Sequence, residues 1–103
     1  MSVSISNRKI EINLNSYMEI VEPKVGNLLD IVDNSKEICI NILNTDQMSG
    51  GIFENVLKIV NYGDHIIVTE KYHSPLGEIY VEKHYEDVKP SAILKILFPD
   101  TFK

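Results

Sequence analysis

The sequence predicts an α+β fold, a two-layer sandwich in which helices cover mainly one face of a mixed sheet. Residues 38–43 form an apolar, β-branched run that is typical of a central strand. Residues 52–60 place apolar side chains on one helical face, and residues 66–68 form a second apolar run. This succession predicts a right-handed crossover with the two strands parallel. The expected order is ββαβαββα, in one domain of residues 1–103.

The composition bounds the class of protein. A chain of 103 residues with 44% hydrophobic and 24% charged residues matches one ordinary globular domain. Its formal net charge of −5 gives no attraction to phosphate backbones, so nucleic acid is not the expected partner. The lone Cys39 cannot form an internal disulfide, the chain starts with polar residues, and no apolar run approaches the roughly 20 residues of a membrane helix. We therefore expect a soluble, cytoplasmic protein with no membrane contact.

The N-terminal segment has the alternation of a β-hairpin. A two-residue turn at Asn7 and Arg8 places Val3 opposite Ile12 and every apolar side chain on one face. Arg8 is a poor second turn residue, which leaves a single bent strand as the alternative. The first helix is expected from Pro23 to near Asn34. Its buried stripe, at helical spacing, consists of Val25, Leu28, Leu29 and Val32.

Turn residues fill positions 44–51, and Gly63 is expected to end the second helix. Residues 65–73 and 78–85 form a predicted hairpin around Pro75 and Gly77, with a register that is ambiguous by one residue. Pro90 starts a short last helix, which Pro99 ends. The faces of the hairpin mix apolar and charged residues, as is typical of solvated strands near a sheet edge: Val68, Glu70, Val81, Glu82 and Lys83.

The loop after the central strand is the candidate ligand site. Glycines ahead of a helix can offer backbone N–H groups and the helix N-terminus to an anion such as phosphate or carboxylate, although most such glycines serve only loop geometry. Ligands of α/β crossovers also bind where the chain leaves a strand. The candidate residues are Asn44, Thr45, Ser49, Gly50 and Gly51.

No catalytic cluster, metal site or cofactor is predicted. Cys39 lies between isoleucines in the middle of a strand, which favours a buried structural thiol over a nucleophile. His73 and His84 fall near opposite ends of the predicted hairpin, so with His65 they do not form a metal site. The hairpin tyrosines could stack on unpaired bases, but neighbouring glutamates oppose binding to nucleic acid.

The last helix has more apolar surface than one contact with a small sheet usually hides. This surface either caps the core or pairs with the same helix of a second copy or with another protein. The candidate interface residues are Ile93, Leu94, Leu97 and Phe98.

The order βαβαββ from Ile10 to Tyr85 resembles the small sulfur-carrier domains of the TusA-like family. The likeness rests on a first strand at 9–14, a helix started by Pro23, an apolar strand ending in the polar turn 42–46, a further helix and a terminal hairpin. The family's Cys-Pro-x-Pro motif, whose cysteine carries a persulfide sulfur, has no counterpart here: residues 17–23 hold one proline and no cysteine. The resemblance therefore implies a cysteine-less relative kept for binding.

These patterns favour a small intracellular, non-enzymatic interaction or regulatory domain that self-associates as a homodimer. The first alternative is a small-molecule or anion-binding protein using the 44–51 loop. The second is the TusA-like relative, acting within a sulfur-relay complex.

Overall fold

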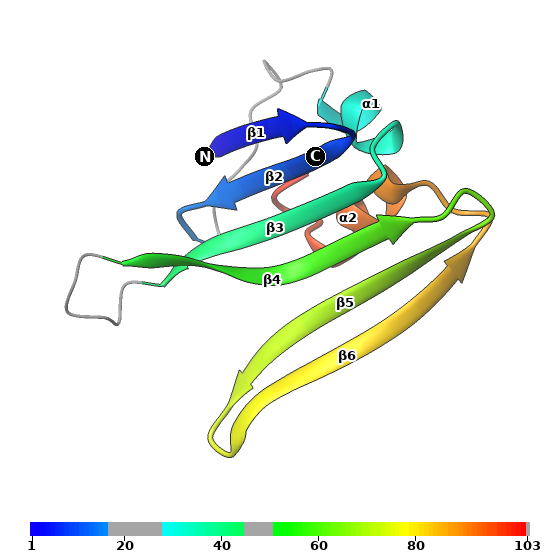
Figure 1. Cartoon of the computed structure of the whole chain (residues 1–103). Helices are drawn as coiled ribbons and strands as arrows, with labels where there is room; N and C mark the ends of the chain where they lie inside the picture. Colours follow the sequence, from blue (N-terminus) through cyan, green and yellow to red (C-terminus); the bar gives the residue numbers. More distant parts are fainter. Residues whose placement is uncertain (17–27, 45–50, 103) are drawn as a thin grey trace.

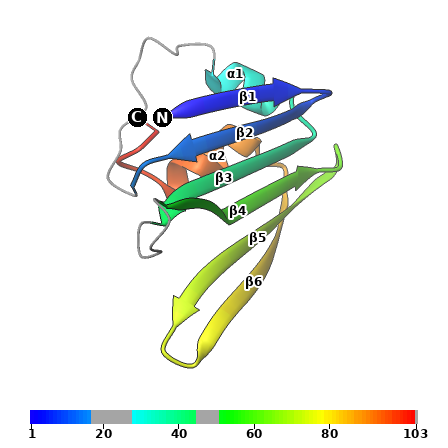
Figure 2. The same cartoon turned by 60° about the vertical axis from the view of Figure 1, so that its left-hand side comes forward.

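The computed structural model describes residues 1–16, 28–44 and 51–102, which form a single six-stranded sheet with two helices on one face (Figures 1 and 2). The strands lie side by side in chain order, and the sheet is mixed because β2 and β3 are parallel while the other neighbours are antiparallel. The α+β class predicted from the sequence is confirmed. The elements are β1 (Ser2–Ser6), β2 (Lys9–Leu14), α1 (Leu28–Asp33), β3 (Glu37–Asn44), β4 (Ile52–Asn61), β5 (His65–Ser74), β6 (Gly77–Glu86) and α2 (Pro90–Leu97).

One element differs from the prediction: residues 52–60 form strand β4 and not a helix. The apolar spacing that favoured a helix comes from a β-bulge. Ile40 pairs with Leu57 while Asn41 pairs with Asn55, which leaves Val56 as an extra residue on β4. The bulge turns two consecutive residues, Val56 and Leu57, toward the core. It therefore breaks the alternation of the strand and produces apolar spacings that imitate a helical face.

The crossover is also placed differently. The parallel pair is β2 with β3, joined through α1, whereas β4 lies between β3 and β5 and is antiparallel to both. Strand β5 is therefore parallel to β3, as expected, but it is not the neighbour of β3. Gly63, with φ of 96°, lies in the turn between β4 and β5, where its N–H donates to Asn61 Oδ1 at 2.9 Å. It is a turn residue and does not end a helix.

Both predicted hairpins are present. Val3 pairs with Ile12 across β1 and β2, and Asn7 and Arg8 adopt φ of 46° and 65°, so the alternative of a single bent strand is wrong. The register of the second hairpin is set by the pairing of Ser74 with Gly77. This hairpin extends away from the helices (Figures 1 and 2).

The core lies between the sheet and the two helices. The isoleucines of β2 and β3 alternate toward it, and Leu28 and Val32 of α1 face it as predicted. Residues 17–27, which include Pro23 and Val25, lie outside the described part of the chain. Two hydrogen bonds of 2.9 Å join the helices, because Asp33 accepts from both the N–H and the hydroxyl of Ser91. The side chains with no solvent exposure include Ile10, Ile12, Ile38, Ile40, Ile59, Ile93 and Leu94.

The opposite face of the sheet carries an amide ladder, a row of hydrogen bonds from β4 to β1. Asn55 Nδ2 donates to Asn41 Oδ1 at 3.0 Å, and Asn41 Nδ2 donates to Asn13 Oδ1 at 2.8 Å. Asn13 Nδ2 in turn donates to Ser2 Oγ at 3.2 Å. The ladder satisfies polar groups on four neighbouring strands, which explains how an amide fits in the middle of the central strand.

The positive φ of Arg8 generates a stability prediction. A non-glycine residue in the left-handed region costs about 1–2 kcal/mol, part of which glycine avoids at the expense of its own flexibility. We expect Arg8→Gly to raise the free energy of unfolding by about 0.5–1 kcal/mol, measured by urea denaturation. Arg8→Ala is the control, because it removes the same side chain and keeps the strain. Equal stabilisation by both variants would contradict this explanation.

Candidate functional site

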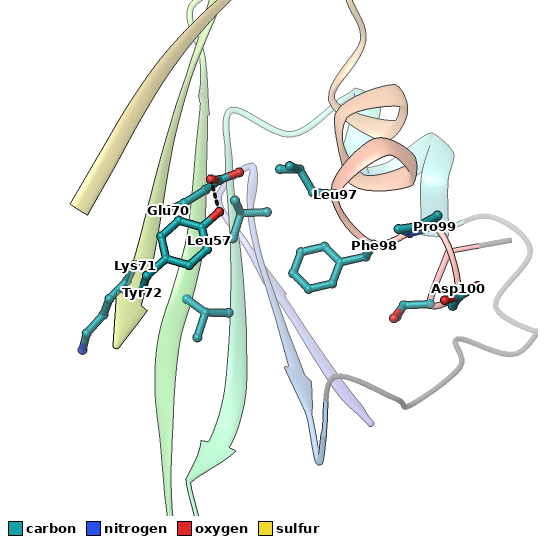
Figure 3. A pocket seen from close by; sticks show the side chains of 10 residues that line it. Leu57, Glu70, Lys71, Tyr72, Leu97, Phe98, Pro99 and Asp100 are labelled. Carbon is teal, nitrogen blue, oxygen red and sulfur yellow. Dashed lines mark hydrogen bonds between the residues drawn. The ribbon is translucent and has the colours of Figure 1, made fainter. Parts of the chain in front are cut away.

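A cavity of about 280 Å³ lies between the sheet and the chain that follows α2 (Figure 3). Its sheet wall comes from β4 and β5, and its opposite wall comes from residues 97–101. The two walls belong to segments distant in sequence, so the cavity exists only in the folded chain. The side chains that define it are Val56, Leu57, Glu70, Tyr72, Leu97 and Phe98.

Local geometry builds each wall. Helix α2 ends as the Phe98 N–H donates to the Leu94 carbonyl, and the next turn closes as the N–H groups of Thr101 and Phe102 donate to the Phe98 carbonyl. Thr101 and Phe102 are buried, so this turn is held against the body of the protein. On the sheet side, the bulge at Val56 supplies two successive apolar side chains where a regular strand would supply one.

Glu70 is the unusual residue of the site. It pairs with Leu57 on β4 and Val81 on β6, on the face that also carries the helices, and it is only 4% exposed. Its Oε2 accepts a hydrogen bond from the Tyr72 hydroxyl and lies 3.4 Å from Lys83 Nζ. Its Oε1 is buried and has no hydrogen-bond partner among the described residues.

An unpaired buried acceptor is costly. Leaving one without a partner costs about 1–3 kcal/mol, and more when the group is charged. Glu70 borders the cavity, and Figure 3 shows its carboxylate on the side of the cavity where Leu97 and Phe98 approach. A donor in the cavity would reach Oε1 once the side chains that cover it shift, and it would find an acceptor already desolvated and held in place by Tyr72.

The electrostatics of the cavity are acidic. Asp100, at the exposed end of the lining, adds a second carboxylate to that of Glu70. Lys71 also borders the cavity, but its ammonium points away from it (Figure 3) and lies 3.1 Å from Glu78. The hydrogen bond from Lys71 to Glu78 raises the pKa of Lys71 and holds its positive charge outside the cavity. Among the described residues, only Lys83 offers a cation to Glu70.

The loop predicted as a ligand site is only partly described, because Thr45, Ser49 and Gly50 lie outside the described residues. The Asn44 amide donates to Glu54 Oε1 at 3.1 Å. Gly51 has φ of 101°, and a Cβ there would lie 3.0 Å from Leu43 Cδ1, so glycine is required by backbone geometry and close approach. Gly51 precedes strand β4 and not the expected helix, so the helix N-terminus invoked for anion binding is wrong, while ligand binding by the loop stays a prediction.

The residues predicted as an interface are divided between core and cavity. Ile93 and Leu94 have no solvent exposure within the single chain, so they are not available to a partner. Leu97 and Phe98 are half-buried and line the cavity. Within α2, the large apolar side chain that reaches the surface is Ile96, at 65% exposure.

Cys39, His65 and His84 occupy separate environments. Cys39 is 7% exposed, as expected of a buried thiol, and burial together with nearby Glu37 raises its pKa. His65 Nδ1 lies 2.7 Å from Asp64, and His84 Nε2 lies 3.0 Å from Glu82. No group of three potential metal ligands occurs among the residues that the structure describes.

Glu70 was missed because its strand was interpreted as having a solvated face. A signal was present: Glu70 continues the two-residue alternation of Ile66 and Val68, both of which are buried. A carboxylate in phase with buried apolar residues is the pattern that could have identified it.

Comparison of the chain with protein-family models, curated protein sequences and solved structures finds no match. Within the described residues, no helix has the length and apolar character needed to cross a bilayer.

The burial of Leu94 generates a prediction about α2. Leu94→Ala should lower the free energy of unfolding by about 2–5 kcal/mol, because it opens a cavity in the core. Ile96→Ala, on the exposed side of the same helix, should change it by no more than about 0.5 kcal/mol. Urea denaturation of both variants is the measurement. Comparable losses would mean that Ile96 is also covered in solution.

Proposed function

We propose that this protein is a small, non-enzymatic binding domain whose ligand occupies the cavity beside Glu70. The observation that carries the proposal is the desolvated Oε1 of Glu70, which borders a cavity with apolar walls and lacks a partner among the described residues. Binding sites commonly combine an apolar lining with a few fixed polar groups. Such a domain fits the interaction or regulatory role expected from the sequence. The proposed binding site is the cavity beside Glu70 and not the 44–51 loop.

The arrangement of Glu70 supports a role in holding a ligand. Tyr72 and Lys83 both approach Oε2, which orients the carboxylate and leaves Oε1 to accept from a molecule in the cavity. The volume of about 280 Å³ lies just below the roughly 300–1,000 Å³ of typical ligand pockets. The fitting ligand is therefore a small organic molecule.

We expect members of a fragment library to shift the methyl resonances of Leu57 and Leu97 in NMR spectra. Leu97→Trp should weaken these fragments at least tenfold, because the larger side chain fills the cavity. Ile96→Trp is the matched control, since it adds the same bulk to the exposed side of α2. Fragments that bind equally well to both variants, or that shift neither methyl group, would overturn the proposal.

A second candidate function is self-association through β6. This ten-residue strand is an edge of the sheet, and the hairpin that it shares with β5 exposes Leu76, Ile79 and Tyr80. A pairing of two β6 strands centred on Val81 would complete a continuous sheet between two copies. This proposal retains the homodimer expected from the sequence and moves its contact away from α2.

Charge selects that register. Centred on Val81, an antiparallel pair places Glu78 opposite His84 and Tyr80 opposite Glu82. Centred one residue later, it places Glu82 opposite its own copy, which like-charge repulsion disfavours.

We expect Tyr80→Glu to weaken dimerisation roughly tenfold relative to Tyr80→Lys, because the first places like charges opposite each other twice per dimer. Within one chain Tyr80 pairs with Lys71, so Tyr80→Glu is favourable for the folded monomer, and a weaker dimer could not be ascribed to unfolding. Sedimentation equilibrium measures the difference. A monomeric wild type at high micromolar concentration, or equal dimerisation of the variants, would exclude this pairing.

The TusA-like alternative stays a prediction that neither the structure nor the comparisons test. The likeness included a helix after the apolar strand, and the structure has strand β4 at that position.

A further inference from the structure

We propose that the cavity beside Glu70 binds a small organic cation, a protonated amine on a short apolar or aromatic body. This inference rests on the proposed function and specifies the class of ligand. Its basis is the juxtaposition of the unpartnered Glu70 Oε1 with the apolar side chains of Leu57, Leu97 and Phe98.

Charge separates a cation from the other ligands that could enter. An anion would meet the buried carboxylate of Glu70, and Asp100 adds negative charge to the chain that forms the opposite wall. A neutral alcohol or amide would satisfy the hydrogen bond but would leave the buried charge without a counter-ion on the cavity side. An ammonium supplies both the hydrogen bond and the positive charge. Hydrogen bonds between charged groups are about twice as strong as those between neutral groups.

Lys83 does not supply the counter-charge that the ligand would bring to Oε1. Its Nζ lies 3.4 Å from Oε2, the oxygen that also accepts from Tyr72, and its side chain is 43% exposed. Water therefore screens its charge, as it does in other exposed ion pairs. A cation at Oε1 would lie on the enclosed side of the same carboxylate, where screening is weaker.

The aromatic lining suits the same class of ligand. The ring of Phe98 projects into the space opposite Glu70, and the ring of Tyr72 lies beside the carboxylate (Figure 3). Aromatic faces attract cations that approach within about 6 Å of the ring centre, and they also pack against an apolar body. Leu57 and Leu97 provide the remaining apolar contacts.

The volume sets the size of the ligand. About 280 Å³ equals the share of liquid volume of about nine water molecules. Phenethylammonium, with a similar number of non-hydrogen atoms, is a suitable probe. Its matched analogue is 2-phenylethanol, which retains a hydrogen-bond donor without the charge. The slightly larger 3-phenylpropionate carries the opposite charge.

The experiment titrates the three probes into the wild type and follows the methyl groups of Leu57 and Leu97 by NMR. We expect phenethylammonium to bind at least tenfold more tightly than 2-phenylethanol, and 3-phenylpropionate to bind most weakly. Glu70→Gln, which retains the shape of the side chain, should abolish the preference for the amine.

Glu82→Gln is the control, because it makes the same chemical change at an exposed position of β6. It should leave the preference for the amine within twofold of wild type, and urea denaturation verifies that both variants fold. If Glu70→Gln fails to fold, Tyr72→Phe takes its place: it removes the donor to Oε2 and should raise the affinity for the amine more than that for 2-phenylethanol, because the carboxylate keeps more of its negative charge for the ligand. An equal change for the two probes would overturn the cation assignment.

The outcomes distinguish this inference from the proposed function. If 2-phenylethanol binds as tightly as the amine, or if Glu70→Gln retains the preference, the cation assignment is overturned while ligand binding in the cavity stands. If no probe moves either methyl group, the cation assignment is overturned, and the fragment library then decides whether the cavity binds any ligand.

Discussion

The docking of α2 onto the central strands is the interaction on which the other features of this protein depend. Ile93 and Leu94 lie in one buried cluster with the isoleucines of β2 and β3, and Ser91 joins α2 to Asp33 at the end of α1. These contacts fix α2, and the burial of Thr101 and Phe102 holds the turn that follows it against the body of the protein. The position of the last turn, and with it one wall of the cavity, is therefore a consequence of core packing.

Glu70 lies at the limit of this helical cover. Farther toward β6, the sheet projects as a hairpin whose side chains are mostly exposed (Figure 1). At this boundary the Glu70 carboxylate has the partly exposed Lys83 on one side and the chain after α2 on the other. This position accounts for one oxygen with partners and one without: Oε2 meets Tyr72 and the partly exposed Lys83, and Oε1 is buried beside the cavity.

Local patterns predicted what local physics determines. The turn at Asn7, the alternation of β2 and the proline that starts α2 all act within a few residues, and each was confirmed. Strand β4 was missed because its bulge depends on pairing with β3, which is distant in sequence. The cavity could not be predicted for the same reason, since it forms where the residues after α2 meet β4 and β5. For Glu70, alternation within β5 supplied a usable clue.

The amide ladder on the open face couples three side chains in a way that no single strand would. Each amide has two orientations, related by a flip of its oxygen and nitrogen, and each donor in the row requires an acceptor on the next strand. Asn55 Nδ2 also donates to the backbone carbonyls of Ile40 and Leu57, at 3.3 and 3.0 Å, and a carbonyl only accepts. The backbone at the bulge therefore fixes the orientation of Asn55, which in turn dictates those of Asn41 and Asn13. Reversing the row would turn Asn13 Oδ1 toward Ser2 and Asn55 Oδ1 toward the two carbonyls, so the bulge in β4 sets the hydrogen-bond direction as far as the N-terminal strand.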